Sequence, residues 1–233
     1  FSVWLDPELP AARIEVGDET VVLQQGEWSG WVPVRFRLAP TQELATTCRF
    51  FLKGVRPTFE LYVTPLNIDP LEPALPISTP PSFAAELAAA TGRYYTLGMP
   101  VDTNVLAGGV LSADEFLAQA RIAGDEVLAQ YRLLLDGFDG GLLFYYFGNA
   151  DQVQHMMFRS LDPGHPAYDA VRDAPYADVI PSLYAGFDAV VGATLARMGP
   201  ETTLVVMSDH GFASWRRSMS LNAWLRDAGY LAV

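Results

Sequence analysis

Apolar and polar side chains alternate along the first quarter of the chain. Between residues 32 and 38, apolar side chains at every second position are separated by a proline and two arginines, and residues 59–64 repeat the alternation. A period of two places the apolar side chains on one face of a strand. Gly17-Asp18 interrupts residues 13–24 as a hairpin turn would. The pattern predicts four or five short strands, in a small sheet or sandwich, over residues 1–66.

The periodicity changes after this region. Six prolines at positions 65 to 81 disfavour both helix and sheet, so we expect an extended crossing segment there. Residues 83–90 then have the pattern of a short helix. Ser112 and Glu115 have the spacing of a capping box and predict the start of a long helix. Residues 176–198 carry apolar side chains at helical spacing and predict another.

Two continuous apolar runs follow the predicted helices. Residues 142–147 and 203–208 each have the composition of a strand that is buried on both faces of a sheet. The order helix, strand, helix, strand is typical of an α/β sheet with crossover connections. We therefore expect an α/β fold, with a β-rich segment at residues 1–66 and a core sheet flanked by helices within residues 67–233.

An Asp/His pair follows each apolar run. Asp209 and His210 come directly after the second run, and Asp151 and His155 come shortly after the first. Ligands in open α/β sheets bind just outside the carboxyl ends of strands. The i, i+4 spacing of Asp151 and His155 places both on one helix face, about 6 Å apart at Cβ. Either pair alone is equally well interpreted as a helix-capping Asp near a surface His. Two such pairs together favour joint metal binding.

Further motifs surround both pairs. Phe158-Arg159 and the stretch 162–166 (Asp-Pro-Gly-His-Pro) follow the first pair; the second lies within Ser-Asp-His-Gly-Phe at 208–212 and precedes Leu-Asn-Ala-Trp-Leu at 221–225. With residues 94–100, these motifs resemble the type I phosphodiesterase/nucleotide pyrophosphatase family of the alkaline phosphatase superfamily. The resemblance covers residues from about 66 to 233. It implies an alkaline-phosphatase-like core sheet and hydrolysis of phosphoesters through a Thr or Ser nucleophile.

The resemblance also implies a pair of zinc-like ions about 4 Å apart. Asp151 and His155 would bind one ion, and Asp209 and His210 the other. Carboxylate oxygen and imidazole nitrogen suit zinc or manganese, and no thiolate cluster suggests a structural zinc site. One ion would lower the pKa of the nucleophile, and both would stabilise the phosphoryl oxygens. The substrate implied is a small-molecule phosphoester or nucleotide.

The sequence departs from the family pattern on both sides of these motifs. In the family, the first Asp ligand and the nucleophile follow an early strand. No segment before Asp151 has the pattern of an apolar strand followed by that motif. The three histidines are His155, His165 and His210, so no later His completes the ligand set. The chain also begins without a methionine. We therefore expect a fragment of a larger enzyme that does not turn over substrate by itself.

Two interpretations remain open for several other side chains. Arg216 and Arg217 lie close enough to the second pair to hold a substrate phosphate in a bidentate manner, or they are solvated loop charges. His165 lies in a Pro-Gly-His-Pro turn, which favours a loop histidine over a ligand. The aromatic group of Trp28, Trp31 and Phe36 is either a stacking platform for a glycan or base, or part of the packing of the β-rich segment.

Composition limits the remaining choices. Half of the residues are hydrophobic and 18% are charged, which suits a globular core and not disorder. A net charge of −12 disfavours binding to a nucleic acid duplex or an anionic membrane, so a substrate phosphate would need the local positive charge of metal ions. Because Cys48 is the single cysteine, an intrachain disulfide is excluded. We expect Cys48 to be a small core residue.

No uninterrupted apolar run reaches the ~18–20 residues that span a bilayer, so we expect no membrane segment, and the sequence leaves the cellular location open. Two alternatives to the phosphodiesterase reading remain. A sulfatase or a phosphoglycerate-mutase-like enzyme of the same superfamily would differ chiefly in the nucleophile segment. A non-catalytic binding module would use the β-rich segment for recognition and keep the metal ligands as vestiges.

Overall fold

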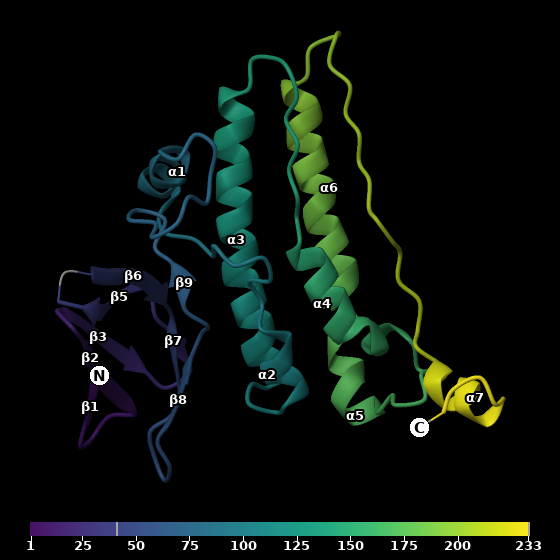
Figure 1. The fold of residues 1–233 in the computed structure, drawn as a ribbon, viewed down its shortest axis with the longest axis horizontal. Coiled ribbons are helices and arrows are strands. Elements are labelled where there is room, and N and C mark those ends of the chain that lie inside the picture. Colours follow the sequence, from purple (N-terminus) through teal and green to yellow (C-terminus); the bar gives the residue numbers. More distant parts are fainter. Residues whose placement is uncertain (41, 233) are drawn as a thin grey trace. The chain divides into compact units, whose positions relative to one another are not determined.

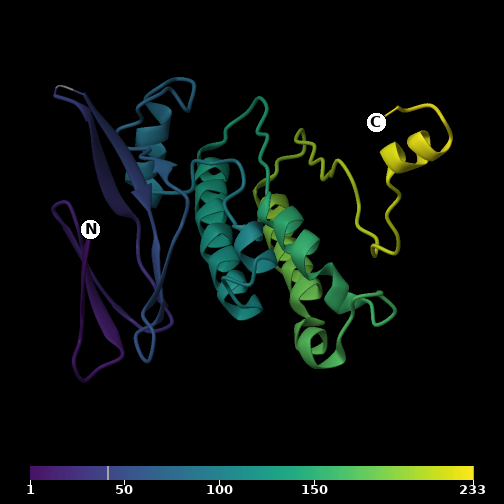
Figure 2. The same ribbon diagram turned by 60° about the horizontal axis from the view of Figure 1, so that its bottom comes forward.

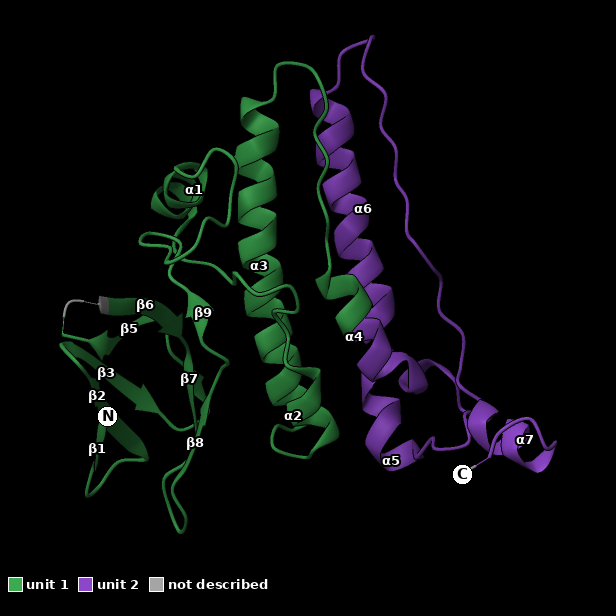
Figure 3. Cartoon of the chain, in the orientation of Figure 1, with its two compact units in different colours: residues 1–152 green, residues 153–233 purple. Residues whose placement is uncertain are grey.

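The computed structural model describes residues 1–40 and 42–232. They form two compact units, Phe1–Gln152 and Val153–Val233, shown in different colours in Figure 3. All strands found among the described residues belong to unit 1, whereas the regular structure of unit 2 is helical. The expectation of an α/β chain with an N-terminal strand-rich region is confirmed.

The strands of unit 1 form three antiparallel sheets of three strands each, in the orders β1-β2-β3, β4-β7-β8 and β5-β6-β9 (Figures 1 and 2). Their bounds are β1 (Ser2–Leu5), β2 (Ala11–Val16), β3 (Glu19–Gln24), β4 (Glu27–Trp28), β5 (Val32–Ala39), β6 (Gln42–Cys48), β7 (Phe50–Gly54), β8 (Glu60–Val63) and β9 (Asn67–Ile68). The predicted hairpin is confirmed, because Val16 pairs with Glu19 across the turn. Gly17 has a φ of 60° there, a conformation that glycine adopts without strain.

A buried cluster lies among these strands. Cys48 is a core member, as predicted, and its burial raises the pKa of the thiol to about 11. The other members are all apolar: Ala12, Ile14, Leu23, Val32, Phe50, Leu52 and Val55. Burial of such side chains is the main favourable contribution to folding of this segment.

The tryptophans of the β-rich segment are used for packing. Trp28 stacks on Phe51 with ring centroids 4.8 Å apart, and Trp31 meets Tyr95 edge-on at 4.6 Å. Phe36 is 39% exposed. The two tryptophans therefore serve the interior of unit 1, and the three rings do not form a shared stacking platform.

The helices of unit 1 agree closely with the sequence pattern. They are α1 (Phe83–Thr91), α2 (Thr103–Ala107) and α3 (Ala113–Gly137), followed by α4 (Asn149–Met157), which crosses the boundary between the units. The capping box is confirmed: the Ser112 hydroxyl accepts from the Glu115 backbone N–H at 3.3 Å, and the Glu115 carboxylate accepts from the Ser112 N–H at 2.7 Å.

A half-buried carboxylate joins the β-rich segment to helix α3. Glu126 accepts hydrogen bonds from Arg49 Nη2 at 2.6 Å, from Trp31 Nε1 at 2.8 Å and from the Tyr95 backbone N–H at 3.1 Å. Burial raises the pKa of Glu126, and the three donors oppose that rise. The Arg49 guanidinium also lies over the Trp31 ring, 4.7 Å from its centroid. One side chain of the long helix thus connects two inter-strand residues of the β-rich segment with the segment that follows α1.

Unit 2 contains the remaining helices. They are η1 (Phe158–Leu161), α5 (Ala170–Asp173), η2 (Ala174–Tyr176), α6 (Val179–Arg197) and α7 (Leu221–Asp227), and α6 confirms the helix predicted over residues 176–198. Within the stretch Ala170–Arg197, an 18-residue window has a mean hydropathy of 1.4, so by length and composition the stretch could cross a membrane. Length and composition alone are weak evidence for a span, because core helices of soluble proteins share them.

The two predicted core strands are not formed. Residues 142–147 and 203–208 are extended segments outside the sheets of the described structure. Leu142, Phe144 and Val206 are 92%, 73% and 72% exposed, whereas Leu143, Tyr145 and Phe147 are half-buried. A buried strand requires hydrogen-bonding neighbours and cover on both faces. Neither run pairs with a strand in the part of the chain that the structure describes, so the apolar pattern alone did not suffice to predict a strand.

Removal of the α3 cap tests the local account of this helix. We expect Ser112→Ala to lower the free energy of unfolding by about 1 kcal/mol, because the Glu115 N–H loses its acceptor. Ser82 precedes α1 but makes no capping hydrogen bond with its side chain, so Ser82→Ala is a matched control with little expected effect. Urea unfolding followed by circular dichroism measures both. Equal losses in the two variants would contradict the capping assignment.

Candidate metal centre

Helix α4 carries Asp151 and His155. The helix begins at Asn149, whose side chain lies against α3 at Gly124: a Cβ added there would be 2.8 Å from the amide nitrogen of Asn149. Gln152 fixes the same turn, because its side-chain amide donates to the Val101 carbonyl at 2.9 Å. The start of α4 is therefore anchored within unit 1, while Asp151 is half-buried and His155 is exposed on the next turn.

His210 lies on the extended segment between α6 and α7. Its backbone N–H donates to the Asp209 carboxylate at 3.1 Å. Its Nδ1 lies 3.1 Å from the Gly211 carbonyl oxygen. This contact is a hydrogen bond in the tautomer that has the proton on Nδ1, and that tautomer places the lone pair of the ring on Nε2. A local backbone contact therefore orients the His210 ring.

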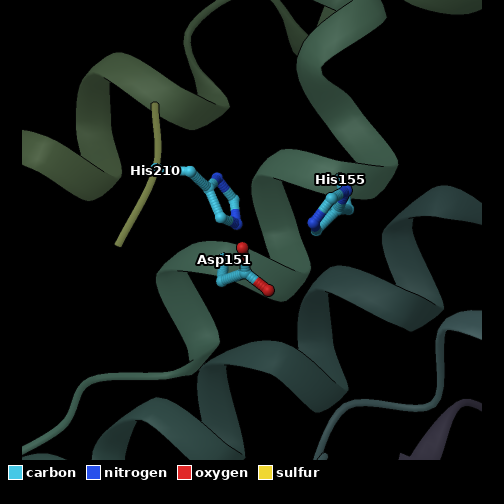
Figure 4. Close-up of side chains that lie close together, drawn as sticks. All are labelled: Asp151, His155 and His210. Carbon is cyan, nitrogen blue, oxygen red and sulfur yellow. The ribbon is translucent and has the colours of Figure 1, made fainter. Parts of the chain in front are cut away.

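Three of the four predicted ligands come together. Ligand atoms of Asp151, His155 and His210 all lie within 4.8 Å of one another (Figure 4). The boundary between the units falls inside the continuous helix α4, so the helix itself holds Asp151 one turn from His155. Two imidazoles and one carboxylate are a donor set that zinc and related ions accept, with positions left for water or substrate. The residues present therefore fit a divalent ion of this class.

Asp209 lies outside the group of three. Its side chain is 89% exposed, and its Oδ1 is 4.0 Å from His210 Nε2. Of the predicted second pair of ligands, His210 therefore belongs to the group of three and Asp209 lies at its edge. A small change in the Asp209 side-chain rotamer would move the carboxylate, because an exposed side chain is not held by packing.

The two arginines differ in their surroundings. Arg216 donates to the Asp162 carboxylate at 2.5 Å and to the Gly164 carbonyl. The pKa of Asp162 is lowered, first by a hydrogen bond from Ser214, with smaller contributions from the Gly164 N–H and from Arg216. Arg216 therefore braces the loop at residues 162–164. Arg217 is exposed on the same segment as His210.

His165 is a loop histidine, as its turn sequence predicted. Its Nδ1 accepts a hydrogen bond from the Ala167 backbone N–H at 3.0 Å, and its own N–H donates to the Asp162 carbonyl at 2.9 Å. These bonds stabilise the turn around it, and His165 is not a member of the group of possible ligands.

An ion-pair cluster next to α4 is absent from the sequence expectations. The buried Asp173 carboxylate accepts from Arg159 Nε at 3.1 Å, from Arg172 Nη2 at 2.8 Å and from the Asp169 N–H at 2.8 Å. Arg159 belongs to η1, directly after the helix that carries His155. The sequence signal for Arg159 was its position in the motif directly after α4. Nothing in the sequence identified Asp173 as the partner of Arg159.

Comparison with known proteins identifies the family. A family model described as Type I phosphodiesterase / nucleotide pyrophosphatase matches residues 3–233. The chain belongs to this family. The match begins within β1, so it includes the β-rich residues that lay outside the resemblance seen in the sequence. No curated protein and no solved structure gives a significant match. Membership assigns the chain to a family of phosphoric ester hydrolases that act on small phosphoester or nucleotide substrates and are generally metal-dependent.

The Asp173 cluster predicts a pH dependence of stability. Hydrogen bonds from Arg172, the Asp169 N–H and Arg159 hold the pKa of Asp173 well below its ordinary value of 3.8. A lowered pKa stabilises the folded protein above that ordinary value, and the contribution is lost as the pH falls further toward the folded pKa. We expect Asp173→Asn to cost about 2 kcal/mol at neutral pH, since hydrogen bonds to a charged group are lost.

Urea unfolding at a series of pH values measures this contribution. The difference between the wild type and Asp173→Asn should shrink as the pH is lowered below 3.8. Asp188→Asn, on the exposed face of α6, is the control and should change stability little at any pH. A constant gap between wild type and Asp173→Asn would show that the carboxylate charge does not carry the effect.

Proposed function

We propose that this chain forms part of the active site of a metal-dependent phosphoesterase. In this proposal Asp151, His155, Asp209 and His210 bind two divalent ions, zinc or manganese. The observation that carries it is the convergence of Asp151, His155 and His210 from a helix and a distant extended segment. In a member of a hydrolase family, three side chains of the types that bind metal ions would hold an ion that takes part in hydrolysis.

The ligands themselves account for several requirements of the reaction. Both imidazoles must be neutral to donate a lone pair, so protons compete with the ion at these positions. The carboxylate of Asp151 supplies negative charge that offsets part of the charge of a cation. When bound, ions of this class polarise phosphoryl oxygens and lower the pKa of a coordinated hydroxyl group. The exposure of His155 and His210 leaves the site open to a substrate from solution.

Electrostatics supports the same arrangement. With a net charge of −12, the surface of the chain repels an anionic phosphoester at long range. A cation at Asp151, His155 and His210 would provide local positive charge, and the exposed Arg217 lies on the same segment as His210. We propose Arg217, and Arg216 after release from Asp162, as the side chains that contact a substrate phosphate.

The proposal places the nucleophile outside residues 1–233. Nothing upstream of Asp151 has the pattern of a strand followed by an Asp and a Thr or Ser nucleophile, and no His follows His210. A Thr or Ser supplied from elsewhere would attack the phosphorus, and the chain alone would be inactive. Residues 67–233 would then belong to the catalytic domain, and residues 1–66 would be an accessory β-rich segment.

Metal titration tests the proposed centre. We expect the 233-residue chain to bind zinc with micromolar or tighter affinity in calorimetry, and Asp151→Ala or His210→Ala to weaken binding at least tenfold, because a ligand is lost. His165→Ala removes the one histidine that lies outside the group, so it should leave binding unchanged. Equal effects of all three substitutions, or no binding to the wild type, would contradict the proposal.

Stoichiometry tests the role of Asp209. If Asp209 and His210 form a second half-site, the wild type should bind two manganese or zinc ions, and Asp209→Ala should bind one. Asp227→Ala, an exposed Asp on α7, serves as the control and should retain both. Binding of a single ion that is insensitive to Asp209→Ala would restrict the centre to Asp151, His155 and His210.

A further inference from the structure

One aromatic side chain contacts both histidines of the group. The ring of Phe212 lies 4.9 Å from the His155 ring and 5.2 Å from the His210 ring, centroid to centroid, and meets both close to edge-on. The two imidazoles are themselves 5.9 Å apart. All three residues belong to unit 2, so these contacts lie within one compact body. Phe212 therefore packs against two imidazoles that come from separate segments.

Phe212 also packs against a second phenyl ring. Phe158, in η1 directly after α4, stacks on Phe212 with centroids 5.7 Å apart and ring planes inclined by 25°. Phe158 in turn precedes Arg159, which is paired with the buried Asp173. The ring of Phe212 is half-buried in this arrangement, whereas His155 is exposed. The phenyl group is thus better supported by packing than the imidazoles that it contacts.

An exposed histidine needs such support to act as a ligand. Rotation about χ2 of histidine is a broad, roughly two-fold torsion, so packing must select the orientation that aims a nitrogen at the ion. Orientation of metal-binding imidazoles by neighbouring groups commonly changes affinity 10–100-fold. The edge-to-face geometry also stabilises the contact directly, because aromatic rings favour this arrangement beyond the burial of their surface.

We propose that Phe212 is a positioning residue that fixes the orientation of both His155 and His210 for metal binding. The inference rests on the proposed metal centre, but it assigns a role to a residue that supplies no ligand atom. Phe212 acts through its contact with the two imidazoles and not through the substrate. Because it follows His210 by two residues, it also holds the extended segment that carries His210 against the end of α4.

Cobalt(II) binding to the full 233-residue chain tests this role, because the visible spectrum of cobalt reports the geometry of its ligands. We expect Phe212→Ala to weaken cobalt binding by about tenfold or more and to alter the absorption bands of the bound ion. Phe212→Tyr keeps the ring and should bind nearly as the wild type does. Phe212→Leu keeps most of the volume without the aromatic edge and should fall between them.

Trp215→Ala is the matched control, since Trp215 lies on the same segment and is 67% exposed. It should leave affinity and spectrum unchanged. Thermal unfolding of each variant shows whether it is folded. If Phe212→Ala does not fold, Phe212→Leu provides the comparison. Wild-type affinity and spectrum in folded Phe212→Ala or Phe212→Leu would overturn the positioning role while leaving the metal centre intact.

Nuclear Overhauser contacts in the metal-free chain separate the two proposals. Cross-peaks from the Phe212 ring to both imidazoles are expected, and Phe212→Ala should give the histidine rings averaged environments. Failure of the wild type to bind cobalt or zinc would overturn the metal centre. Absence of the ring contacts in the wild type would overturn the role of Phe212, whatever the metal titration shows.

Discussion

The hydrogen-bonded cluster around the half-buried Glu126 carboxylate is the interaction on which the organisation of unit 1 depends. A carboxylate in the interior is costly unless its charge and lone pairs are satisfied, and removal of one partner leaves the other uncompensated. Arg49, Trp31 and the Tyr95 backbone provide that satisfaction from three different parts of the chain. Two residues earlier on the same helix, Gly124 leaves room for the Asn149 side chain at the start of α4. Helix α3 therefore links the sheets on one side to the helix with Asp151 on the other.

The candidate centre combines a rigid part and an adjustable part. Asp151 and His155 occupy successive turns of one helix, so backbone hydrogen bonds set their spacing. His210 comes from a segment without regular structure, and its placement depends on side-chain contacts with Phe212 and on the Gly211 carbonyl. In the proposed centre, the helix would therefore define where an ion sits, and the extended segment would supply the third ligand. The phenyl rings at positions 158 and 212 connect the two parts.

Local signals in the sequence predicted local structure well. The capping box at Ser112, the hairpin at Gly17 and the helix at residues 179–197 each depend on neighbours within a few residues, and all are present. The strands expected at residues 142–147 and 203–208 depend on partners far away in the chain, which the sequence pattern does not reveal. For the same reason the i, i+4 spacing predicted that Asp151 and His155 share a helix face, but the roles of Phe212 and Asp173 emerged only from the folded chain.

The exposed apolar segments at residues 142–147 and 203–208 have a consequence for the behaviour of the chain in concentrated solution. Extended stretches rich in valine, leucine and aromatic residues are templates for pairing between molecules. The net charge of −12 opposes such encounters through repulsion between whole molecules. Salt shortens the range of that repulsion to about 10 Å at 0.1 M. Colloidal stability of the chain therefore depends on ionic strength through these two segments, and conditions that weaken the repulsion favour assembly through strand pairing.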